Sequence, residues 1–159
     1  MKKQWLLNLF LLGLAIVLAA FILFSEEKPD SRQLPQLTDI DPGTIRQISI
    51  SHNGHSTQLE KHNGSWQISK PLQIAANDFR VKTILQLLNA PVHRTFKPTE
   101  LDTEKIGLAD DMTAGNTRIR FDHREIIFGI VNPATGLRYV RMGDHIYTIE
   151  DVYSPLLTS

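Results

Sequence analysis

Histidine is the residue type in this chain with the clearest chemical capacity, because imidazole nitrogens bind metals and exchange protons near neutral pH. His52 and His55 flank an Asn-Gly turn, which would place their Cβ atoms about 5 Å apart on neighbouring strands. His62 would lie ~23 Å further along the strand and point to the opposite face. With no third ligand in sight, we predict no metal and no cofactor. The histidine pair is the one candidate, and polar residues at turn ends are the simpler interpretation.

The motifs of familiar enzyme classes are missing from the sequence. It has no G-x-S-x-G, H-E-x-x-H, P-loop or G-x-G-x-x-G motif, and no cysteine, which excludes thiol nucleophiles, disulfides and thiolate zinc sites. Carboxylates come close together at Asp102/Glu104 and at Asp110/Asp111. Acids in polar connections are usually solvated, and a catalytic one would need a pocket and a shifted pKa. We therefore expect no catalytic residues and no enzymatic activity.

Arginine and tyrosine side chains offer a different chemistry, the binding of anionic groups. Tyr139 shares a strand face with Arg141, and Arg138, Tyr139 and Arg141 are the candidate binding residues for an anionic ligand, an envelope polymer or a protein loop. The alternative is a solvated face, in which Arg120 pairs with Glu125 across two strands. Four arginines lie on expected strands: Arg118, Arg120, Arg138 and Arg141.

Composition limits the classes of protein to which the chain can belong. Its 159 residues include 17 Lys and Arg against 17 Asp and Glu, so the formal net charge is zero. A neutral chain lacks the basic footprint of a nucleic-acid-binding protein, and we predict no nucleic-acid partner. The length suits one folded domain.

A long apolar run stands near the N-terminus. Trp5 to Phe24 contains no charge, and 20 residues of helix span ~30 Å, the thickness of the hydrocarbon core of a bilayer. We predict a membrane anchor that contacts lipid through residues 5–24. Asn8 could bind a neighbouring helix in the membrane, or it could reach headgroup water. A cleaved signal peptide is the alternative, but its apolar region is normally ~7–15 residues long.

The flanks of this run set its orientation and the domain plan. Lys2 and Lys3 precede it, while acidic residues dominate behind it, so the N-terminus should stay in the cytoplasm. We expect a single-pass protein of the bacterial inner membrane. Residues 1–24 would form the N-terminus and anchor, residues 25–44 with three prolines an extended linker, and residues 45–159 a periplasmic domain.

Two Asn-Gly turns organise the first part of that domain. Asn53-Gly54 and Asn63-Gly64 suit type I′ hairpin turns. The two registers agree, because both place Leu59 in one cross-strand row with Ile48 and Ile68. Trp66 falls on the same face, with Lys61 over its ring, and the other face is polar. We predict a three-stranded meander with one buried face.

The rest of the domain should add a helix and a second hairpin series. Asn77 can cap a helix that carries an apolar stripe up to Leu88 and ends before Pro91. Two further hairpins, over 116–130 and 137–149, pair Ile119 with Ile126 and Val140 with Tyr147. A short strand at 92–96 and a short C-terminal helix from Glu150 or Asp151 complete the plan. The fold class is therefore α+β, a transmembrane helix followed by a mainly antiparallel sheet.

Several short motifs are spread along this region: Gly64-Ser65-Trp66-Gln67-Ile68, Lys70-Pro71, Ala76-Asn77-Asp78, Ile106-Gly107-Leu108, Phe128-Gly129-Ile130, Gly136 to Arg141 and Ile146 to Ile149. In these motifs, from roughly Ile45 to Ser154, the chain resembles the bacterial family catalogued as domain of unknown function 4340. The resemblance implies a single-span envelope protein, of which some accompany ABC-type export systems. It implies no catalytic residue and no ligand.

The expected function is therefore that of a non-enzymatic, membrane-anchored periplasmic scaffold or accessory subunit of a cell-envelope or transport complex. Its partner would be a membrane protein, and a subunit of an ABC-type transporter is one candidate. A periplasmic binding module for a small anionic ligand or an envelope polymer is the alternative. An enzyme of unrecognised type is a third option.

The membrane topology can be tested directly. A reporter enzyme that is active only outside the cytoplasm, fused after Ser159, should be active, because the positive N-terminal flank keeps that end inside. N-terminal sequencing of the mature protein should still find residues 1–24. A mature N-terminus near Ser25 would contradict the anchor.

Overall fold

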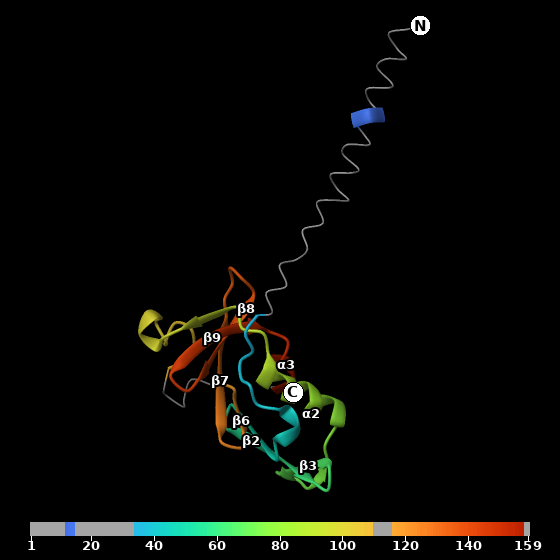
Figure 1. Cartoon of the computed structure of the whole chain (residues 1–159). Coiled ribbons are helices and arrows are strands. Elements are labelled where there is room, and N and C mark those ends of the chain that lie inside the picture. The colour runs from blue at the N-terminus through green and yellow to red at the C-terminus, as the bar shows by residue number, and fades with distance from the viewer. Residues whose placement is uncertain (1–11, 15–33, 110–115, 158–159) are drawn as a thin grey trace, which may run out of the picture. The chain divides into compact units, whose positions relative to one another are not determined.

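The computed structural model describes residues 12–14, 34–109 and 116–157 (Figure 1). The chain divides into two units, Met1–Gln33 and Leu34–Ser159. In the first unit residues 12–14 are helical, and the remainder of the expected anchor, including Asn8, lies outside the described residues. Within the described ranges, no helix has both the length and the hydrophobicity to cross a bilayer.

In the described part of the second unit, nine strands form one sheet in the order β4-β3-β2-β1-β6-β7-β8-β9-β5. Every pair of neighbouring strands is antiparallel. With few helices beside it, the sheet confirms the predicted α+β class. The strands are β1 (Gln47–His52), β2 (His55–His62), β3 (Ser65–Lys70), β4 (Ile74–Ala75), β5 (Arg94–Phe96), β6 (Arg118–Phe121), β7 (Arg124–Val131), β8 (Leu137–Met142) and β9 (His145–Glu150).

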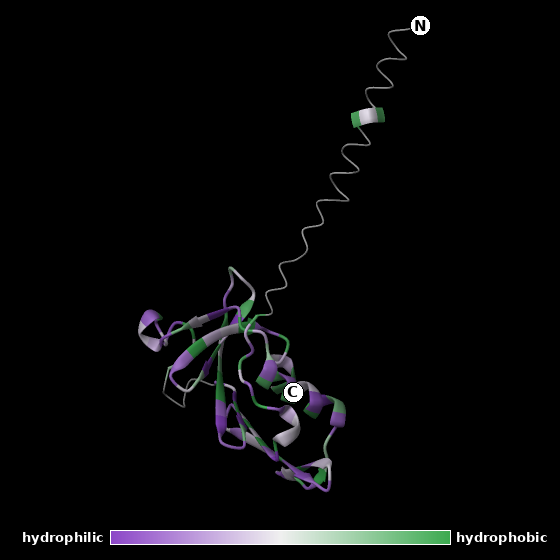
Figure 2. Cartoon of the chain, viewed as in Figure 1, coloured by the Kyte–Doolittle hydropathy of each residue, from purple (hydrophilic) through white to green (hydrophobic). Residues whose placement is uncertain are grey.

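The hairpin registers match the predictions. Ile48 pairs with Leu59, and Leu59 with Ile68, so the predicted row exists. Asn53 and Gly54 have φ angles of 49° and 79°, as a type I′ turn requires. Hydrophobic and hydrophilic residues alternate along these strands (Figure 2), and Lys61 Nζ lies 6.0 Å from the centre of the Trp66 ring. The predicted pairings in the later hairpins are also confirmed: Ile119 with Ile126, and Val140 with Tyr147.

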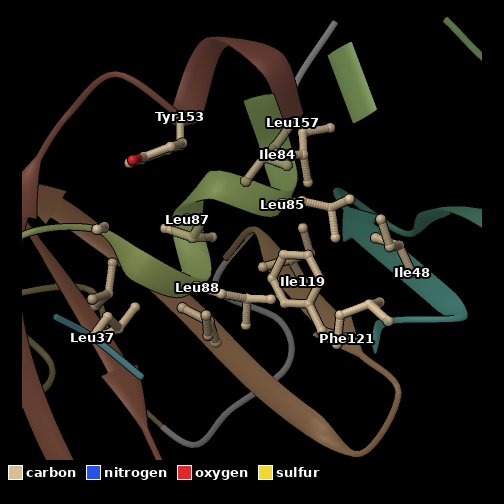
Figure 3. Close-up of a cluster of buried hydrophobic side chains, with 14 of the residues drawn as sticks. Leu37, Ile48, Ile84, Leu85, Leu87, Leu88, Ile119, Phe121, Tyr153 and Leu157 are labelled. Carbon is tan, nitrogen blue, oxygen red and sulfur yellow. The ribbon is translucent and has the colours of Figure 1, made fainter. Parts of the chain in front are cut away.

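A helical segment covers the apolar face of the sheet. Helix α2 (Asp78–Leu85) is capped by Asn77, whose side chain accepts a hydrogen bond from the Arg80 N–H, as predicted. The 3₁₀ helix η2 (Gln86–Asn89) continues it. Figure 3 shows Leu85 and Leu88 of these elements close to Ile48, Ile119 and Phe121 of the sheet. Each of these three sheet residues is fully buried, so this contact forms the main core.

The chain joins the compact unit earlier than expected. Residues 34–44 were predicted to be linker, yet the unit begins at Leu34. Leu37 is buried in the main core, the Thr38 N–H and hydroxyl both donate to the Leu88 carbonyl, and Pro42–Thr44 forms the 3₁₀ helix η1. The prolines of this stretch suggested an extended chain, but one well-placed leucine and backbone bonds to η2 hold it against the domain.

The short C-terminal helix begins later than expected. Helix α3 spans Ser154–Leu157, whereas the sequence suggested a start at Glu150 or Asp151. Strand β9 continues to Glu150, so the helix can begin only after the turn that follows. Tyr153 and Leu157 are buried against the main core. Burial raises the pKa of the Tyr153 hydroxyl, and the negative charge of Glu150 adds to the effect.

A second, smaller core lies on the other face of the sheet. Its buried members are Ile127 and Ile146 of the sheet and Leu108 of the covering segment. This segment follows the 3₁₀ helix η3 (Pro98–Glu100). Here the β7–β8 register shifts between Phe128 and Val131. This bulge lets the Ile130 N–H donate to the Ile106 carbonyl at 2.9 Å, which fixes the covering segment to the sheet.

The bulge requires glycine at position 129. A Cβ atom there would lie 2.4 Å from the Ile106 carbonyl oxygen and 2.9 Å from Leu108 Cγ. Backbone and core atoms at these distances cannot move aside cheaply. We therefore expect Gly129→Ala to lower the free energy of unfolding by about 2–4 kcal/mol.

Gly136→Ala is the matched control for this prediction. Gly136 has a φ of 71° and open space where a Cβ would stand. Gly136→Ala should therefore lower the free energy of unfolding by about 1 kcal/mol, through backbone strain alone. Urea unfolding of the full chain in detergent measures the two losses in the free energy of unfolding. The dependence of this free energy on urea concentration should be the same for both variants as for the wild type. Equal losses would mean that the segment at Ile106 does not pack on the bulge.

Candidate functional site

Two of the four arginines come together on the face of the sheet opposite to the main core. Arg118 pairs in register with Ser51, and Arg120 with Ser49. The four side chains line a hollow of about 240 Å³ together with Glu125. We call it the Arg118 hollow, with the members Ser49, Ser51, Arg118, Arg120 and Glu125.

The lining of the Arg118 hollow has two positive side chains and one negative side chain. Arg120 Nη2 and Glu125 Oε1 form the predicted cross-strand ion pair at 3.0 Å, in an exposed position. Arg118 is different, because its Nη2 is buried and finds no hydrogen-bond partner among the residues that the structure describes. The hollow therefore contains one neutralised pair and one guanidinium with unused donor capacity.

Arg141 lies on the same face, two strands away. It pairs in register with Ile127, and Ile127 pairs with Arg118, so the three residues form one row. Arg141 lines a neighbouring hollow of about 330 Å³ that also includes His123 and Glu125. Glu125 thus borders both hollows.

Arg138 has a structural position of its own. Its Nε and Nη2 bind the two carboxylate oxygens of Asp151 at 2.5 and 3.0 Å, and its Nη1 donates to the Gly129 carbonyl in the bulge. It also pairs in register with Ile149, a member of the main core. Strand alternation therefore places Arg138 on the opposite face from Arg141. A single groove would not collect both side chains.

Tyr139 shares its face with Arg141, as the sequence indicated, but it is engaged in packing. Its ring contacts the second core, and its hydroxyl accepts a hydrogen bond from Asn132 Nδ2 at 2.9 Å. The predicted trio of Arg138, Tyr139 and Arg141 is thus divided between two faces and two environments. The residue that sequence reasoning undervalued is Arg118, whose contact with Ser51 depends on the pairing of β1 with β6.

His52 and His55 stand opposite each other, as the turn predicted. Both nitrogens of His52 are already used, because Nδ1 lies 2.8 Å from Thr117 Oγ1 and Nε2 lies 2.9 Å from Asn53 Nδ2. The amide nitrogen of Asn53 can only donate, so Nε2 accepts and Nδ1–H donates to Thr117. Across residues 12–14, 34–109 and 116–157, no three His, Cys, Asp or Glu side chains gather closely enough to hold a metal ion.

The carboxylates in the polar connection are solvated where the structure describes them. Asp102 Oδ2 lies 2.8 Å from Lys105 Nζ, and both side chains are exposed. The hydrogen bond from the Lys105 side chain lowers the pKa of Asp102. Asp110 and Asp111 lie outside the described residues. Asp102 therefore stays ionised and has no feature of a general acid.

Apolar groups gather at the β4 end of the sheet. Leu72 before β4, Ile74 in β4 and Phe79 in the first turn of α2 are 69%, 55% and 76% exposed, and we call these three residues the β4 surface. Ile74 pairs in register with Ile68 of β3. Ile68 in turn lines an apolar groove of about 230 Å³ between the sheet, α2 and α3. Most other members of this groove are apolar, among them Ile50, Leu59, Val81, Ile84 and Leu157, and the polar members are Thr57, Asn77 and Arg80.

The Arg138–Asp151 ion pair should stabilise the fold more than the exposed Arg120–Glu125 ion pair. Asp151→Asn should lower the free energy of unfolding by about 1–3 kcal/mol, since it weakens a bidentate, half-buried ion pair. The same ion pair holds Arg138 in place to donate to the Gly129 carbonyl in the bulge. Glu125→Gln is the control and should cost less than about 1 kcal/mol, because its pair is exposed. Chemical unfolding of both variants measures this, and equal effects would contradict the structural role of Arg138.

Comparison of the chain with protein-family models, with curated proteins and with solved structures finds no match. The resemblance to the family of domain of unknown function 4340 therefore stays a prediction. The structure does give a physical reason for two of the motifs that carry it. Ile106-Gly107-Leu108 and Phe128-Gly129-Ile130 are the two sides of the contact at the β7 bulge.

Proposed function

We propose that the chain is a non-enzymatic scaffold or accessory subunit of a bacterial cell-envelope complex. Residues 5–24 would anchor it in the inner membrane, and the unit that begins at Leu34 would lie in the periplasm. The observation that carries this proposal is the β4 surface. Exposed apolar clusters on otherwise polar domains commonly mark contacts with other proteins.

The β4 surface includes residues at an unprotected edge of the sheet, the edge formed by β4. Strand β4 is the last strand on its side, and residues 71–77 contain no charged side chain. Soluble proteins usually shield such edges with charges or a covering element, because free backbone groups recruit other strands. Residues 71–75 are all exposed, so this edge is accessible to a partner.

The apolar groove extends the same surface into a concave site. Ile68 belongs to the groove and is the register partner of Ile74 in the β4 surface, so the two features are continuous. The occupant we propose is an extended segment of a partner protein. It would add a strand beside β4 and insert an apolar side chain into the groove. The family resemblance supports a membrane complex of the ABC-transporter type as the source of that segment.

Polar substitutions on the β4 surface test this proposal. Ile74→Asp and Phe79→Asp should each reduce, by about tenfold, the partner recovered after mild crosslinking and purification from native membranes, because a buried charge opposes docking. Ile130→Asp is the matched control: Ile130 is 46% exposed on β7, away from β4, and recovery should not change.

The membrane anchor provides the opposing outcome. If the partner is held through the span, Asn8→Leu and an unrelated span in place of residues 5–24 should lower recovery, while Ile74→Asp should not. That result would contradict docking at the β4 surface. It would leave the protein as a subunit assembled in the membrane.

A further inference from the structure

Two buried nitrogen atoms at the start of β6 have no hydrogen-bond partner among the described residues. They are Arg118 Nη2 and Asn116 Nδ2. Backbone pairing continues back to Thr117, whose carbonyl accepts from the Phe128 N–H at 2.9 Å. Asn116 precedes β6 and is not among the residues that line the Arg118 hollow, so the site depends on Arg118.

Unpaired donors of this kind are costly. Folded proteins leave few buried polar atoms without a partner, and each exception calls for an explanation, such as a water or an ion that satisfies it. The penalty is larger for a charged group than for a neutral one. A guanidinium that lines a hollow and keeps an unpartnered N–H group is suited to bind oxygen acceptors.

The surroundings favour an anion over water alone. Ser51 stands directly opposite Arg118 in the β1–β6 register, and Ser49 opposite Arg120, so hydroxyl donors from β1 face the same hollow. Glu125 is the one carboxylate in the lining, and Arg120 neutralises it. The charge of Arg118 therefore has no counter-charge within the hollow, whose 240 Å³ exceeds the space of a single water.

We propose that the Arg118 hollow binds an oxyanion, the carboxylate or phosphate group of a small molecule or of an envelope polymer. The planar guanidinium of Arg118 would donate hydrogen bonds to two oxygens of the anion. The hydroxyl groups of Ser51 and Ser49 would donate to the remaining acceptor positions. This site goes beyond the proposed function, because it lies on the sheet face opposite to the apolar groove.

Titration of the full-length protein in detergent tests the site. Isothermal calorimetry with inorganic phosphate and, separately, with acetate, at constant ionic strength set by chloride, should detect saturable binding of at least one anion. Phosphate alone would identify a phosphate group, acetate alone a carboxylate, and both the oxyanion class. Binding of neither anion at tens of millimolar would overturn the proposal.

Variants connect the binding to Arg118. Arg118→Gln should weaken the affinity at least about tenfold, because it removes the charge and the fork. Ser51→Ala should weaken it a few-fold. Arg94→Gln is the control: Arg94 is exposed on the edge strand β5, four strands away from β6, and the affinity should not change. Equal affinities for wild type and Arg118→Gln would overturn the site.

Two further measurements decide the case in which Arg118→Gln does not fold and separate the anion site from the docking surface. If Arg118→Gln does not fold, as judged by circular dichroism, Ser51→Ala decides alone, and its failure to weaken binding contradicts the proposal. Ile74→Asp should leave anion affinity unchanged while it disrupts partner recovery. The anion site and the docking surface can therefore fail independently.

Discussion

The pairing of β1 with β6 is the constraint on which the rest of the domain depends. Each hairpin series can form from local signals, but neither buries its apolar face by itself. Their junction places Ile48 beside Phe121 and Ile50 beside Ile119, which creates a continuous surface wide enough for α2 and η2. The turn residue Asp122 strengthens this junction, since its carboxylate accepts from the Gln47 N–H at 2.8 Å and its own N–H donates to the Gln47 carbonyl.

Local features of the fold could be predicted because their causes are local. An Asn-Gly dipeptide accepts positive φ angles, and once the turn is fixed, alternation determines every pair in the hairpin. The β1–β6 junction has no such signal, as it joins residues about seventy positions apart. The bulge at Gly129 and the packing of Leu37 against η2 depend on the same tertiary arrangement, so the sequence pattern did not indicate them.

The candidate site shows the same division. The Arg120–Glu125 pair follows from one hairpin and was predictable. The Arg138–Asp151 pair was not, because Asp151 lies beyond the end of β9 and is turned back toward β8. Arg118 meets Ser51 only through the β1–β6 junction. The same junction thus joins an apolar face, which carries the main core and the groove, to an opposite face on which Arg118 and Arg120 meet Ser51 and Ser49 beside the second core.

The packing of residues 35–38 has a mechanical consequence. Leu37 and Thr38 donate backbone hydrogen bonds to Ala90 and Leu88, and the Val92 N–H donates to the Pro35 carbonyl. Leu37 is also inserted into the main core. A pulling load that enters the domain through Leu34 would therefore act on these three bonds and on the core behind η2. Strand β4 takes part in none of these bonds, so tension on the chain would not act directly on the open edge.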